Sequence, residues 1–215
     1  RVWLLDEYLL INTGKLPGPF FRMEYLLDRK YLRYYGTWNK PKSWKIQGVE
    51  PKEGLKMIDR VVGVFNSISY ESFNLNKSRV QLEKYSEQLN MYIDKESFAK
   101  FLSILCYAGE THVDDIHNNA FWMDPVSGKL KPVLIDTGGL SFDLNRHLNR
   151  PITKDRGAFI RPWLINPINF SIYIDHLYEF INSIGSIENV KPLILDTWEK
   201  IKPDAVADIL ASKSG

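Results

Sequence analysis

Short apolar runs separated by turn residues occupy the start of the chain, a pattern typical of strands. The apolar runs 8–11 and 19–27 flank a segment with Asn, Gly and Pro, which predicts a strand, a turn and a second strand. We expect a helix to follow over 28–35. Residues 36–54 are rich in Gly, Pro and Lys, and they indicate a loop with one short strand at 43–47.

Apolar residues then recur at helical spacing. Residues 55–72 place apolar side chains on one face, and 76–93 form a more polar helical stretch. Asp94 has the residue type of a helix N-cap, with Glu96 in the first turn and an apolar run behind it. The C-terminal part predicts three more helices, at 167–184, around 187–200, and from Pro203 or Asp204 onward. No clear periodicity is present over 143–162.

A polar loop and two β-prone runs lie between these helical regions. Residues 109–119 are mostly polar, and the apolar runs 120–124 and 130–136 follow. Pro, Ser and Gly in the segment between the two runs favour a hairpin. The sequence therefore predicts an α+β fold, with a small β-containing N-terminal piece, a helical C-terminal piece and one hairpin between helices.

Composition excludes several classes of protein. The chain has 28 basic and 26 acidic residues, so no basic field indicates nucleic acid or an anionic membrane as partner. Its single cysteine, Cys106, lies in an apolar run, which excludes an internal disulfide and indicates a core thiol. No apolar run reaches about 18 residues, so no membrane span is expected. The chain opens at Arg1 without a signal-peptide pattern, and we expect further sequence upstream.

Carboxylates and amides cluster around the predicted hairpin. Asp114 lies five residues before Asn119, and Asp136 ends the second apolar run, followed by Thr137 and two glycines. Phosphoryl transfer needs a carboxylate that orients and deprotonates a hydroxyl, and oxygen ligands that hold Mg²⁺ against the ATP phosphates. Protein kinases place this base five residues before a metal-binding Asn, with a second metal-binding Asp beyond the next hairpin. The spacing predicts ATP-dependent phosphoryl transfer.

Two registers of this loop stay open. Asp115 and Asn118 carry the same functional groups as their neighbours Asp114 and Asn119, so Asp115 is kept as a second candidate catalytic residue. We favour Asp114 and Asn119 because Asn119 directly precedes the strand. In addition, the run from His112 fits the pattern H-x-D-x₄-N, which resembles the loop of aminoglycoside-phosphotransferase-like kinases.

Other chemistries fit these residues less well. His112 and His117 beside the two aspartates suggest an imidazole–carboxylate metal site, but no H-E-x-x-H motif is present. Neither a G-x-S-x-G elbow nor a Walker P-loop occurs. Glycosidase carboxylates would leave Asn119 and Asp136 without roles. A polar loop of this kind is often only a solvated turn, so the prediction depends on its combination with the hairpin and the glycines.

At this point three regions resemble the spore coat protein H (CotH) kinase family, an atypical branch of the protein-kinase-like fold. Residues 10–36 are similar to that family's strand–turn–strand and following helix. Residues 114–136 resemble its catalytic loop and hairpin, and 164–208 resemble its C-terminal helices. The resemblance implies a partial N-lobe with hinge and helix at 1–35. The remainder, 36–215, would be mainly a helical C-lobe.

The resemblance also implies roles for individual residues. Within the C-lobe, 111–119 would be the catalytic loop and 120–139 the metal-binding hairpin. Asp114 would be the catalytic aspartate, with Asn119 and Asp136 as metal ligands. The implied cofactors are ATP and Mg²⁺ or Mn²⁺, and the implied substrate is a hydroxyl, often on a protein serine. The segment Met23, Glu24 and Tyr25 resembles a hinge that holds the adenine. Family members are associated with spores, cell surfaces or secretion, which favours a location outside the cytoplasm.

Departures from the family pattern keep further functions open. The phosphate-contacting lysine and its glutamate partner normally lie upstream of the hinge, and no glycine-rich loop precedes Glu24. Lys42 and Lys45 flank Trp44 and are candidates for phosphate contact, although lysines in such a loop are more often simply solvated.

Two other functions stay open because of these departures. The first is that of a pseudokinase-like module that binds nucleotide or a partner without transfer. A more remote one is that of a metal-dependent hydrolase that uses the same acidic cluster.

Overall fold

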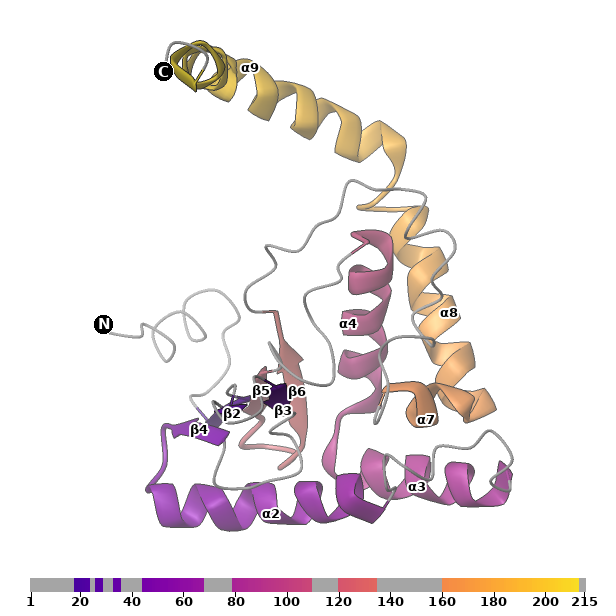
Figure 1. Ribbon diagram of the computed structural model, residues 1–215. Helices are drawn as coiled ribbons and strands as arrows, with labels where there is room; N and C mark the ends of the chain where they lie inside the picture. Colours follow the sequence, from indigo (N-terminus) through magenta and orange to yellow (C-terminus); the bar gives the residue numbers. More distant parts are fainter. Residues whose placement is uncertain are drawn as a thin grey trace.

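The computed structural model describes residues 18–23, 26–28, 33–35, 44–67, 79–109, 120–134 and 160–212. This part of the chain is α+β and mostly helical, which confirms the predicted fold class at that level (Figure 1). Its strands are β1 (Phe20–Met23), β2 (Leu26–Asp28), β3 (Arg33–Tyr35), β4 (Trp44–Gln47), β5 (Ala120–Met123) and β6 (Leu130–Val133). Its helices are α2 (Pro51–Ser67), α3 (Arg79–Tyr92), α4 (Lys95–Tyr107), α7 (Ile160–Ile165), α8 (Pro167–Ile181) and α9 (Ile187–Ser212).

Four strands form one antiparallel sheet with the order β4-β1-β5-β6. The predicted hairpin is confirmed as β5 and β6, in which Ala120 pairs with Val133 and Met123 pairs with Leu130. The predicted strand at 43–47 is confirmed as β4. β1 lies between β4 and β5, so the sheet joins strands from both sides of the expected boundary at residue 35.

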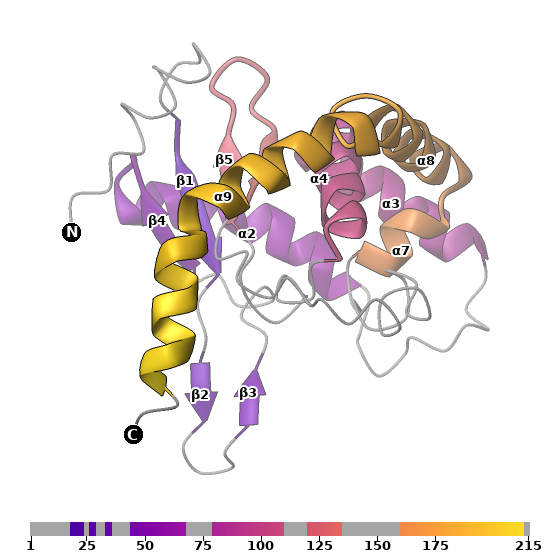
Figure 2. The ribbon, with the colours of Figure 1, turned by 90° about the horizontal axis from the view of Figure 1, so that it is seen from above.

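The expected helix over 28–35 is wrong. The structure has strands β2 and β3 there, paired antiparallel with Leu27 opposite Tyr34 (Figure 2). Leucine and tyrosine recur on both sides of the short connection, and aromatic side chains favour strands over helices. Asp28 pairs with Arg33 across this small hairpin.

Local capping explains where two of the helices begin. The Asp94 carboxylate accepts a hydrogen bond from the Ser97 backbone N–H at 2.8 Å, which confirms the predicted start of α4. Asn166 is the N-cap of α8, and its side chain accepts hydrogen bonds from the backbone N–H groups of Ile168 and Asn169. Pro167 at the first helical position needs no hydrogen-bond acceptor for its nitrogen.

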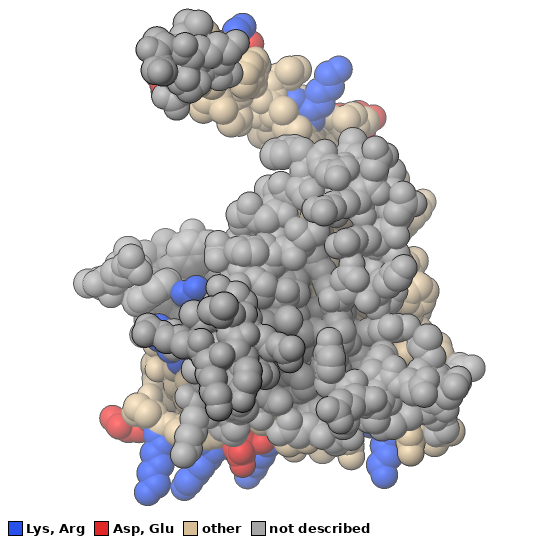
Figure 3. Space-filling view, in the orientation of Figure 1, with Lys and Arg blue, Asp and Glu red and all other residues tan. Residues whose placement is uncertain are grey.

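The main core lies between one face of the sheet and the helices. Phe21 and Phe121 project from neighbouring strands on this face, and both are buried. They belong to one apolar cluster with Ile58 of α2, Leu89 of α3 and Leu102 of α4. α2 runs beneath the sheet in Figure 1, and its exposed side carries both basic and acidic residues (Figure 3). Ile58 is fully buried, as expected for the apolar helix face predicted within 55–72.

Two helical regions differ from the sequence-based expectation. α7 lies partly within 143–162, where no periodicity was found, and its buried residues Trp163 and Leu164 are adjacent rather than spaced by a turn. The expected break before Pro203 is also wrong, because α9 continues through Pro192 and Pro203 to Ser212. The ribbon of α9 changes direction along its length, as expected for a helix with internal proline (Figure 2).

Among the helices in the described part of the chain, none has the length and apolar character needed to cross a membrane.

Candidate functional site at the Ala120 end of the sheet

Four strand ends come together at one end of the antiparallel sheet. Met23 at the end of β1 pairs with Trp44 at the start of β4, and Arg22 of β1 pairs with Ala120 at the start of β5. Ala120 in turn pairs with Val133 at the end of β6. We call this the Ala120 end of the sheet. Four connections therefore meet the sheet here: the chain after Met23, the chain before Trp44, the chain before Ala120 and the chain after Val133.

The predicted site residues belong in sequence to three of these connections, those after Met23, before Ala120 and after Val133. Glu24 and Tyr25 directly follow β1, Asn119 directly precedes β5, and Asp136 follows β6 by three residues. Glu24, Tyr25, Asp114, Asp115, Asn119 and Asp136 all lie outside the described residues. Met23 is described as part of β1 by its backbone alone. The described strands thus define one end of each candidate segment.

Interactions at the opposite end hold the hairpin in one register. The ammonium of Lys131 donates to Asp124 Oδ2 at 2.7 Å, and the Val126 backbone N–H donates to Asp124 Oδ1 at 3.0 Å. The hydrogen bond from Lys131, followed by that from Val126, lowers the pKa of Asp124 to about 2. Gly128 has a positive φ of 66° in this turn, which glycine adopts without steric cost. A one-residue slip would break all of these contacts.

α4 is held at both of its ends, by the hairpin at its start and by the turn after α8 at its end. At its start, the Asp94 backbone N–H donates to the Leu130 carbonyl at 2.9 Å. Burial raises the pKa of Asp94, but hydrogen bonds from Ser97 and the charges of Lys131 and Lys129 outweigh it, so this pKa lies below its usual value. At its end, the Tyr107 hydroxyl donates to the Gly185 carbonyl at 2.6 Å and so anchors α4 to the turn after α8. The predicted buried helix and the predicted hairpin are therefore present, and the loop between them lies outside the described residues.

Two basic residues lie near the Ala120 end. Arg22 pairs with both Lys45 and Ala120 in the sheet register, which puts these three side chains on the face opposite to the main core. Lys45 is exposed and Arg22 is half-buried. Lys45 was a candidate for phosphate contact, whereas Arg22 was not singled out. Successive residues of a strand point to opposite faces, so the position of Arg22 directly after Phe21 was the signal that could have placed it away from the main core.

Histidine and cysteine chemistry finds no support in the described part of the chain. Within those residues no group of three or more His, Cys, Asp and Glu side chains is arranged to hold a metal ion. His112 and His117 lie outside them. His176 contacts Glu96 Oε2 at 2.9 Å through Nε2 and Glu179 Oε2 at 3.5 Å through Nδ1, an arrangement that links α4 to α8. Cys106 is partly buried against the main core, consistent with a packing role.

Comparison of the sequence with protein-family models gives no match, and no curated protein matches it.

Proposed function

We propose that this chain is a protein-kinase-like phosphotransferase that uses ATP and Mg²⁺ or Mn²⁺ to phosphorylate a hydroxyl group, on a protein serine or threonine. One observation carries this proposal: the register of β1, β5 and β6 leads the hinge-like segment, the candidate catalytic loop and the Asp136 segment to the same end of the sheet. Residues that are far apart in the sequence can act on one nucleotide only if their segments converge in this way.

The residue types fit this chemistry. A carboxylate, Asp114 or its neighbour Asp115, would accept the proton of the attacking hydroxyl. The hydroxyl oxygen then forms a bond to the γ-phosphorus, and the bond from that phosphorus to the bridging oxygen breaks, leaving ADP. Asn119 and Asp136 offer the oxygen ligands that Mg²⁺ prefers, and a bound metal ion would neutralise the phosphate charge. The basic side chains of Arg22 and Lys45 add positive charge to the Ala120 end.

The proposal is tested by nucleotide binding and phosphotransfer with matched variants. We expect the parent chain to bind ATP with Mg²⁺ or Mn²⁺ and to phosphorylate a generic protein substrate. Asp136→Asn should lose the metal-dependent part of ATP binding. Asp114→Asn should bind ATP normally but lower the transfer rate at least 100-fold, because general-base catalysis contributes about 10²–10⁴. Asp59→Asn on the exposed side of α2 is the control and should change neither.

Each remaining outcome has a definite meaning. Loss of transfer with Asp115→Asn but not with Asp114→Asn would move the catalytic role by one residue. ATP binding without transfer by the parent would favour the pseudokinase-like module. Absence of metal-dependent nucleotide binding in the parent would contradict the proposal, and phosphate release from substrates other than ATP would favour the hydrolase.

A further inference from the structure

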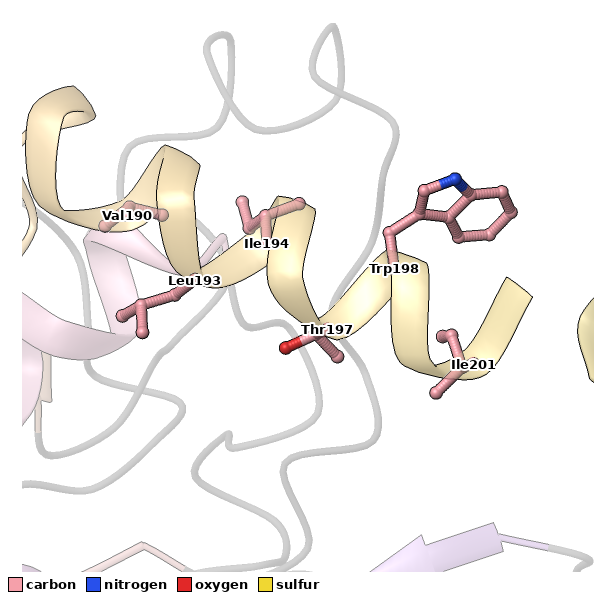
Figure 4. A pocket seen from close by; sticks show the side chains of 6 residues that line it. All are labelled: Val190, Leu193, Ile194, Thr197, Trp198 and Ile201. Carbon is pink, nitrogen blue, oxygen red and sulfur yellow. The ribbon is translucent and has the colours of Figure 1, made fainter. Parts of the chain in front are cut away.

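We draw no further inference here: the strongest candidate, the shallow apolar hollow along α9 around Leu193, Ile194 and Trp198 (Figure 4), carries nothing because nothing in the described part of the chain shows what covers it.

Discussion

At the scale of single residues, a few polar side chains fix how the elements meet. Asp124 closes the turn of the β5–β6 hairpin through Lys131 and the Val126 backbone. Asn169 is buried, and its side chain links three helices. Asp94 is a third such residue, and only its role could be assigned from the sequence, because a helix cap involves residues that are close in the chain. The roles of Asp124 and Asn169 depend on partners that the fold brings together.

Stability should depend on the charge of Asp124 in a defined pH range. Its folded-state pKa of about 2 lies below the ordinary value of about 3.9, so the ionised form stabilises the fold. This contribution is complete above about pH 5 and is lost as the pH falls toward 2. Asp124→Asn should lower the free energy of unfolding by about 1 kcal/mol at pH 7. Urea unfolding should show a smaller difference at pH 3, and an equal difference at both pH values would contradict the ion-pair account.

The buried amide of Asn169 should be costly to remove. Its Nδ2 donates to the Trp163 carbonyl at 3.1 Å and to Ser86 Oγ, and its Oδ1 accepts from Asn90 Nδ2 at 3.0 Å. Asn169→Leu leaves these groups short of a partner inside the protein, so unfolding free energy should fall by about 3 kcal/mol. Ser171→Leu, on the exposed side of α8, should change it by less than about 0.5 kcal/mol. Equal losses of unfolding free energy for Asn169→Leu and Ser171→Leu in chemical denaturation would contradict the role of the Asn169 hydrogen bonds.

At the scale of elements, some local signals predicted the structure and others did not. The β5–β6 hairpin and the start of α4 follow from residues close in sequence, and both were predicted. The helix expected over 28–35 was wrong because lysine, arginine and leucine favour a helix, and the strand preference of the tyrosines was overlooked. α9 continues past Pro203 because proline can bend a helix without ending it.

Two glycines offer a test of how closely β1 approaches the hairpin. A Cβ at Gly18 would lie 2.2 Å from the Met123 carbonyl oxygen, whereas a Cβ at Gly63 on α2 would have no neighbour within 4 Å. Gly18→Ala must push β1 away from β5 and should lower the melting temperature by several degrees. Gly63→Ala should raise stability by up to about 1 kcal/mol, because alanine favours helix. A neutral Gly18→Ala in thermal unfolding would contradict the close approach.

At the scale of the whole molecule, the sheet order carries the functional argument. Spacing alone suggested that Asp114, Asn119 and Asp136 act together, but it did not show that β1 lies beside β5. That pairing joins residues about a hundred positions apart through the packing of Phe21 and Phe121, which no local pattern reveals. The α+β class was predicted, and the Ala120 end could be recognised only from the fold. The chemistry assigned to it rests on the sequence.

The most direct test is to locate a bound nucleotide on the sheet by nuclear magnetic resonance. Mn²⁺ with ATP should broaden the backbone amide signals of Met23, Ala120 and Val133 at the Ala120 end. Val126 and Gly128 in the turn at the other end should broaden much less, because four strand residues at about 3.4 Å each separate the two ends and the effect falls steeply with distance. Broadening centred on the turn, or none at any of these residues, would contradict a nucleotide site at the Ala120 end.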